Sequence, residues 1–176
     1  ARYSRDCIVT EKIDGTNAQI YIPEPHTADE FALKDEPFWI GSRTHWITLK
    51  TDNHGFARWA HDHAESLLTL GPGRHFGEFW GPGIQRGYGL AEKRFSLFNV
   101  KRWADAAVRP ACCHVVPLLW EGSFDDLQAE ALCQDLARSG SVASPGFMRP
   151  EGIVIFHIAA NDFFKKTILK DEHHKG

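Results

Sequence analysis

Short runs of β-branched and aromatic residues, each bounded by turn residues, restrict the fold of this chain more than any other feature. Gly, Pro, Asp or Asn flanks the runs, which is typical of β-strands. The runs are residues 7–10, 18–22, 38–40, 76–80, 95–100, 115–119, 152–157 and 163–168. So many strands, without regularly alternating helices, favour an α+β fold with largely antiparallel sheets over a doubly wound fold.

Two segments have the spacing of amphipathic helices instead. The first is residues 56–68, for which Asp52 or Asn53 is the expected N-cap. The second is expected to begin after Ser123 as its N-cap and to end at Gly140, with acidic residues suited to the positive end of the helix dipole. Its buried stripe is expected to consist of Phe124, Leu127, Ala131 and Leu136.

Length and composition indicate an ordinary globular protein. A chain of 176 residues suggests a single domain over residues 1–176, with a surface loop at 23–37. No apolar run approaches the ~20 residues of a membrane helix, and the four cysteines form no C-x-x-C pair, so we expect a cytoplasmic protein with reduced thiols. The net charge of −3 does not indicate nucleic-acid binding, but basic residues gather at 74–102 and acidic ones at 121–136.

Residues 11–17 (EKIDGTN) lie between two predicted strands and contain a candidate nucleophile. The simpler interpretation is a β-hairpin with an Asp-Gly turn and a solvated Lys12. As a nucleophile, Lys12 would have to lose its proton, which a nearby cation favours. Lys165 and Lys166, in the last predicted strand, could supply that cation, although alone they are typical of an exposed edge strand.

Two carboxylates occur in apolar strand contexts, Glu78 and Glu151. Each lies either on the wet face of a sheet or in a cleft, where it could hold a sugar hydroxyl or a metal ion. Arg43 suits phosphate binding, and Phe98 is either a core residue or a platform on which a base stacks. The glycine-rich segment at 81–89 lacks the G-K-[ST] of a P-loop and is interpreted as a loop beside the site.

In chain order, these segments resemble the six collinear motifs of the covalent nucleotidyltransferase superfamily, which contains DNA ligases, RNA ligases and mRNA capping enzymes. Residues 11–17 resemble motif I (K-x-D/H-G-x-N/R), with Lys12 at the nucleotide-accepting lysine. The other matches are Ser42-Arg43 to motif Ia, Glu78-Phe79 to motif III, residues 95–100 to motif IIIa, residues 151–154 to motif IV and Lys165-Lys166 to motif V. Asn17 is typical of nick-sealing RNA ligases, since DNA ligases and capping enzymes usually carry Arg there.

The resemblance implies a nucleotidyltransferase fold, in which two antiparallel sheets with flanking helices enclose an ATP cleft. It implies an ATP-dependent RNA ligase that joins RNA 5′-phosphate and 3′-hydroxyl ends through AMP bound covalently to Lys12. Mg²⁺, or Mn²⁺, would lie near Glu151, and Lys165 or Lys166 would contact the α-phosphate. Further ATP or AMP contacts are implied for Glu11, Asn17, Arg43, Glu78 and Phe98.

The resemblance leaves alternatives open. Motif V of RNA ligases is commonly K-x-K, so the adjacent Lys165 and Lys166 do not tell which of them faces the phosphate. Only eight residues follow Ile168, so no C-terminal oligonucleotide-binding module is expected. RNA would then be held by the basic zone at 74–102 or by a separate partner protein. The alternatives to a ligase are a non-catalytic RNA-binding domain and an adenylyltransferase subunit that needs a partner to seal.

Overall fold

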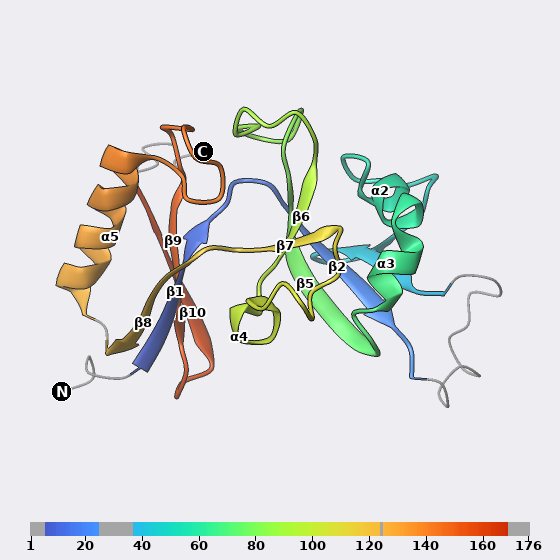
Figure 1. The fold of residues 1–176 in the computed structure, drawn as a ribbon, viewed down its shortest axis with the longest axis horizontal. Coiled ribbons are helices and arrows are strands. Elements are labelled where there is room, and N and C mark those ends of the chain that lie inside the picture. The colour runs from blue at the N-terminus through green and yellow to red at the C-terminus, as the bar shows by residue number, and fades with distance from the viewer. Residues whose placement is uncertain (1–5, 25–36, 124, 169–176) are drawn as a thin grey trace. The chain divides into compact units, whose positions relative to one another are not determined.

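The computed structural model describes residues 6–24, 37–123 and 125–168, which fall into two compact units (Figure 1). Unit 1 contains residues 1–14, 88–90 and 116–176, and unit 2 contains residues 15–87 and 91–115. Most of the expected surface loop at 23–37, and Phe124 of the expected helix stripe, lie outside the described residues.

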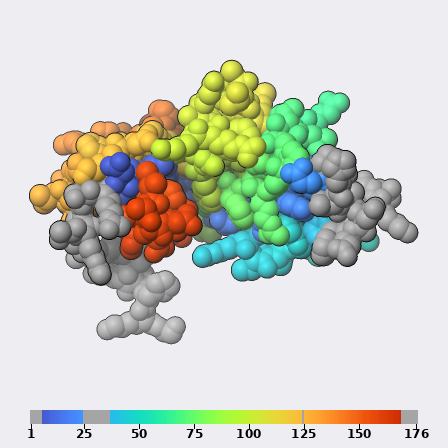
Figure 2. All heavy atoms as spheres, turned by 90° about the horizontal axis from the view of Figure 1, so that it is seen from below, coloured from blue at the N-terminus to red at the C-terminus, as the bar shows by residue number. Residues whose placement is uncertain are grey.

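Unit 1 is built on a four-stranded antiparallel sheet with the order β10-β9-β1-β8. The strands are β1 (Asp6–Lys12), β8 (Leu118–Ser123), β9 (Gly152–His157) and β10 (Asp162–Thr167). One face carries the helix α5 (Asp126–Ser139), and the core between them contains Cys7, Val9, Ala129, Cys133, Leu136 and Ile153. β10 is an edge strand whose first four residues are exposed, and its red-orange atoms lie at the surface in Figure 2.

The helix α5 begins later than the sequence predicts. Asp125 is the N-cap, because its carboxylate accepts from the Gln128 N–H while the Gln128 side chain accepts from the Asp125 N–H in a capping box. Ser123 is instead the last residue of β8. This start places Leu127, 81% exposed, and Ala131 on the solvent side, so the predicted stripe was wrong at these two positions and right at Leu136. Gly140 is the C-cap, as expected.

Unit 2 is built on a six-stranded sheet with the order β4-β3-β2-β5-β6-β7. The strands are β2 (Thr16–Ile22), β3 (Trp39–Ser42), β4 (Trp46–Ile47), β5 (Gly73–Trp80), β6 (Arg94–Leu97) and β7 (Cys113–Val115). The pair β6–β7 is parallel and the other described pairs are antiparallel, which agrees with the expectation of largely antiparallel sheets. A core of 17 buried residues, among them Ile20, Phe79 and Phe95, covers one face of the sheet.

The predicted helix at 56–68 is present as two short helices, α2 (Phe56–Asp62) and α3 (Ala64–Leu68), joined at His63. Gly55 is the N-cap, but Asp52 satisfies the first free N–H groups, since its carboxylate accepts from Ala57 and Arg58. A further short helix, α4 (Val100–Trp103), follows β6. None of the described helices is long and apolar enough to cross a bilayer.

The strands β1 and β2 belong to different sheets, so the hairpin interpretation of residues 11–17 was wrong. The mixed α+β fold with two sheets was predicted correctly. The chain leaves unit 1 at Asp14 and enters unit 2 at Gly15. The four cysteines are free thiols, as expected.

Candidate active site

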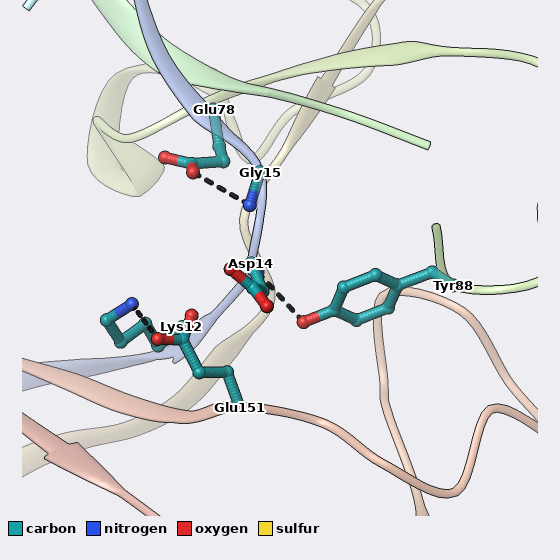
Figure 3. A network of polar contacts seen from close by, with 6 residues as sticks. All are labelled: Lys12, Asp14, Gly15, Glu78, Tyr88 and Glu151. Atoms are coloured by element: carbon teal, nitrogen blue, oxygen red, sulfur yellow. Dashed lines mark hydrogen bonds and ion pairs between the residues drawn. The ribbon is translucent and has the colours of Figure 1, made fainter. Parts of the chain in front are cut away.

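Lys12 is the last residue of β1, and its ammonium group forms an ion pair with Glu151 (Figure 3). The pairing of β1 with β9 explains the contact, because Lys12 lies opposite Gly152, the residue that follows Glu151. Both side chains are largely buried, with 21% of Lys12 and 14% of Glu151 exposed. Within the described part of the chain, the second carboxylate oxygen, Glu151 Oε2, is buried and has no hydrogen-bond partner. A buried, unsatisfied carboxylate oxygen is costly, so this atom is suited to bind a cation or a donor from a ligand.

The register of the sheet distinguishes the two lysines of β10. Lys165 lies opposite Val154 of β9, which in turn lies opposite Thr10 of β1. Lys166 lies opposite Ile153, which in turn lies opposite Glu11. Since side chains alternate between faces, Lys165 shares a face with Lys12, and Lys166 lies on the face that carries α5. Lys166 forms an ion pair of 2.8 Å with Glu130 of that helix. Glu130 accordingly raises the pKa of Lys166.

Glu11 has its side chain on the helix face of the same sheet, and its carboxylate accepts three hydrogen bonds. The donors are Ser141 Oγ at 2.6 Å and the backbone N–H groups of Val142 and Ala143 at 2.8 and 2.9 Å. Burial nevertheless raises the pKa of Glu11, and these hydrogen bonds oppose the rise. Only 1% of Glu11 is exposed. The side chain therefore anchors the end of β1, one residue before Lys12, and the expected contact of Glu11 with ATP stays a prediction.

Tyr88 is a residue of this region that the sequence did not reveal. Its hydroxyl accepts the backbone N–H of Asp14 at 2.9 Å (Figure 3), and only 1% of the residue is exposed. Its ring packs on Phe147 with centroids 4.5 Å apart, and Ser144 Oγ donates to its carbonyl. Burial raises the pKa of the Tyr88 hydroxyl, which keeps it protonated. The sequence signal for this role was the aromatic residue itself, within the glycine-rich segment at 81–89. That segment was interpreted as a loop.

In unit 2, Asn17 and Glu78 lie directly opposite each other on β2 and β5. Glu78 Oε1 accepts the Gly15 N–H at 3.0 Å (Figure 3). This contact needs glycine, because a Cβ at position 15 would lie 2.5 Å from the carbonyl oxygen of Phe79. The Asp14-Gly15 sequence therefore lets the start of β2 approach β5 closely, so that the backbone N–H can orient the Glu78 carboxylate.

Phe98 shares a sheet face with Asn17 and Glu78. The Phe98 N–H donates to the Phe76 carbonyl at 3.0 Å, which extends the pairing of β5 and β6 beyond the last residue of β6. The alternation from Glu78 to Phe76 then places Phe98 on the face opposite the apolar core, and the ring is 37% exposed. Phe98 is therefore not a core residue. Arg43 is exposed in the turn between β3 and β4.

The predicted residues are thus divided between the units. Unit 1 carries Lys12, Glu151 and Lys165 on or beside one sheet face, and unit 2 carries Asn17, Glu78 and Phe98 on one face of the other sheet. The described residues contain no group of three or more His, Cys, Asp or Glu that could hold a metal ion. A divalent cation at Glu151 Oε2 would accordingly take most of its ligands from phosphates and water, which is usual for Mg²⁺.

Comparisons with known proteins give one family for the sequence and one similar fold for the structure. The sequence model of the family described as RNA ligase matches residues 5–170. The structure is similar to that of Naegleria gruberi RNA ligase, with a TM-score of 0.66 and 19% identity to the E312A mutant with AMP and Mn, covering 94% of this chain and 50% of that one. For the same ligase with PPi, the TM-score is 0.61 and the identity 20%, over 93% of this chain and 50% of that one. The chain spans about half the length of these solved ligases. No curated protein matches it in sequence.

Proposed function

Because this chain belongs to the RNA ligase family, we propose that it joins RNA ends with ATP through an adenylate carried on Lys12. The pair of Lys12 and Glu151 at the end of β1, with one Glu151 oxygen left without a partner in the described structure, is the observation that carries this proposal. It combines a potential nucleophile with a carboxylate oxygen available to a cation. Related structures with ATP and Mn support the use of ATP and a divalent metal.

The reaction would proceed in three displacements at phosphorus. Lys12 Nζ forms a bond to the α-phosphorus of ATP, the bond to the β-phosphate oxygen breaks, and pyrophosphate leaves with its electron pair. A 5′-phosphate oxygen of RNA then takes the AMP and releases the lysine amine. Finally, the 3′-hydroxyl of the other RNA end attacks the activated 5′-phosphate, loses its proton, and expels AMP. Such chemistry depends mainly on positioning and on neutralising negative charge.

The ion pair between Lys12 and Glu151 must weaken before Lys12 can attack the α-phosphorus of ATP, since the carboxylate favours the protonated, unreactive amine. Mg²⁺ or Mn²⁺ bound at Glu151 would neutralise charge on the phosphates and offset the attraction of that carboxylate for the ammonium group. Lys165 lies on the same sheet face as Lys12, which suits it to the α-phosphate. Lys166 is engaged by Glu130 on the opposite face, so we do not assign it this role.

The residues of unit 2 suit the nucleoside. Glu78, already oriented by the Gly15 N–H, would accept from a ribose hydroxyl, and Asn17 beside it would bind the sugar or phosphate. Phe98 presents an exposed ring on the same face for stacking on adenine. Arg43, exposed after β3, would contact a phosphate.

Covalent labelling tests the proposal directly. Protein freed of bound nucleotide is mixed with Mg²⁺ and ATP labelled in the α-phosphate, and label that survives denaturing electrophoresis is measured. We expect labelling of the wild type, none without metal, and none in Lys12→Arg, which keeps the charge but cannot act as the nucleophile. A wild type that never acquires label, or a Lys12→Arg variant that labels normally, would contradict the proposal. Sealing of nicked and single-stranded RNA by labelled protein then identifies the accepted ends.

A further inference from the structure

A cluster of aromatic rings around one arginine lies on unit 2, on the sheet face that carries Asn17 and Glu78. Tyr21 of β2 lies opposite Trp39 of β3 on one side and opposite Arg74 of β5 on the other. Trp46 of β4 lies opposite Gly41 of β3. We call Tyr21, Trp39, Trp46 and Arg74 the aromatic platform.

The rings of the aromatic platform contact one another and the cation. Trp39 and Trp46 meet edge to face with centroids 5.2 Å apart, and Tyr21 lies 6.3 Å from Trp46. The Arg74 guanidinium lies over two rings, 5.4 Å from the centroid of Tyr21 and 5.2 Å from that of Trp46. Trp46 is 37% exposed and Arg74 is exposed, so the group is open to solvent, and the cyan segment around β3 and β4 lies at the surface in Figure 2.

The aromatic platform continues the face on which the nucleoside residues lie. Along β2, Asn17 and Tyr21 point to the same side, four residues or about 13 Å apart. Between them in the sheet, Phe76 and Phe98 are 45% and 37% exposed. The face thus presents exposed aromatic rings at intervals along one sheet. Arg74 supplies a positive charge at the end that carries the aromatic platform.

The chemistry of this face matches unpaired nucleic acid. Unpaired bases stack on aromatic rings whatever their sequence, and arginine adds cation–π and phosphate contacts. A base-paired duplex keeps its π-faces stacked internally and could not use the rings. Elsewhere in the predicted basic zone, Arg94 lies over Trp80, Lys93 donates to the His54 carbonyl and Arg102 donates to the Leu70 carbonyl, whereas Arg74 lies on the aromatic platform.

We propose that the aromatic platform binds the unpaired bases of a single-stranded RNA segment leading to the site of joining. The proposal rests on the proposed function, because the family's substrate identifies the nucleic acid as RNA. It assigns to this sheet face the substrate contact that the sequence had left to a basic zone or a partner protein.

Fluorescence anisotropy with a labelled, 5′-phosphorylated single-stranded RNA tests the proposal. Trp46→Ala should weaken binding about 5- to 100-fold, the range for loss of one base–aromatic stack. Arg74→Lys, which keeps the charge, should recover only part of the loss seen in Arg74→Gln, because the planar guanidinium also stacks. Trp120→Ala is the matched control, since Trp120 is also 37% exposed but lies on β8 of unit 1. It should bind like the wild type.

Other outcomes separate this proposal from the function on which it rests. Labelling of Lys12 by ATP needs no RNA, so Trp46→Ala should label normally, and a failure of labelling in the wild type would contradict the ligase function alone. If Trp46→Ala and Arg74→Gln bind single-stranded RNA as the wild type does, the aromatic platform is not an RNA site. If the same two substitutions weakened the binding of a duplex of the same sequence equally, the proposal would also be overturned. Stacking on unpaired bases could not then explain the loss of affinity.

Discussion

At the scale of single residues, the two adjacent lysines of β10 have different surroundings although the sequence could not distinguish them. Lys165 shares the face of Lys12, whereas Lys166 is paired with Glu130 of α5. The difference arises from the alternation of side chains in a strand whose register is fixed by β9. Each lysine should therefore respond differently to removal.

We expect Lys165→Ala to slow the formation of labelled protein at least about 100-fold, the usual cost of removing a group that stabilises developing charge. Lys166→Ala should stay within about threefold of the wild type, because an exposed ion pair contributes only ~0–1 kcal/mol. The measurement is the initial rate of label incorporation at saturating ATP. A large loss in Lys166→Ala with normal labelling of Lys165→Ala would reverse the assignment.

Glu11 gives a prediction about pH. Its carboxyl pKa is raised above the ordinary value of 4.5 by burial, so the folded state binds its proton more readily than the unfolded state. The contribution of this group to stability is therefore greatest at low pH and falls as pH rises from about 4.5 through the raised pKa. Glu11→Gln can keep two of the three hydrogen bonds, since its carbonyl can accept from the N–H groups of Val142 and Ala143. Its amide N–H can donate to Ser141 Oγ, which reverses the bond that Ser141 donates to Glu11.

Urea unfolding at several pH values measures this effect. Relative to the wild type, the free energy of unfolding of Glu11→Gln should increase as pH rises from about 4.5 through the raised pKa of Glu11. Glu11→Ala is the comparison, because it leaves buried donors unsatisfied and should cost about 1–3 kcal/mol or more at every pH. A constant difference between Glu11→Gln and the wild type over this range would show that the carboxyl does not titrate abnormally.

At the scale of elements, close backbone approaches give two motif glycines a structural purpose. Gly15 lets β2 approach β5, and Gly152 lets β9 approach β10. A Cβ at position 152 would lie 2.0 Å from the Lys166 carbonyl oxygen, so the two strands would have to separate. Because β10 carries Lys165, the effect should extend to the candidate site.

We expect Gly152→Ala to lower both the thermal stability and the labelling rate, since it displaces β10 relative to β9. Gly146→Ala is the matched control, because Gly146 has a φ of 92° but no atom within 4 Å of an added Cβ. It should cost only about 1–2 kcal/mol of backbone strain and leave the labelling rate near that of the wild type. Normal labelling of Gly152→Ala would mean that the strand pairing near Lys165 does not matter for the reaction.

Elements that depend on local sequence were predictable, and long-range relations were not. The predicted strand runs overlap strands of the structure because alternation and turn residues are local signals. The run at 115–119, predicted as one strand, was wrong in that it contains the end of β7 and the start of β8, which belong to different sheets. The two-residue β4 was too short to detect, and the start of α5 was misplaced because Ser123 and Asp125 are both good caps. Which sheet β2 joins depends on partners far along the chain. The roles of Glu11 and Tyr88 were missed for the same reason, since their partners lie 130 and 74 residues away.

The candidate site was predicted as residue types and order, but not as geometry. Lys12, Glu151, Glu78 and Asn17 were identified by their motifs. The structure adds the ion pair, the close approach of Gly15 and the different surroundings of Lys165 and Lys166. Glu11 was predicted to contact ATP because it lies within motif I. Its burial could not be known without the segment at 141–143, which no local pattern connects to β1.

At the scale of the whole molecule, the two units have separate cores of unequal size. Among the described residues, the core cluster of unit 1 contains six buried residues and that of unit 2 contains 17, and the two clusters share none. The smaller core supports β1 and β9, which carry or adjoin Lys12 and Glu151. A core substitution in unit 1 therefore removes a larger fraction of that unit's packing than a similar substitution in unit 2. The packing of unit 1 is the part that supports the proposed nucleophile, Lys12.

Leu136→Ala, in the core of unit 1, should cost about 2–5 kcal/mol, the usual range for a buried leucine. Because no core residue is shared, amide exchange should quicken in β1, β9 and α5 while β2 and β5 keep their protection. Leu97→Ala is the matched control in unit 2, and it should give the opposite pattern. Exchange measured by mass spectrometry tests both variants. If either variant loses protection equally in both sheets, the units unfold as one cooperative body, and damage to either core would reach Lys12 in the same way.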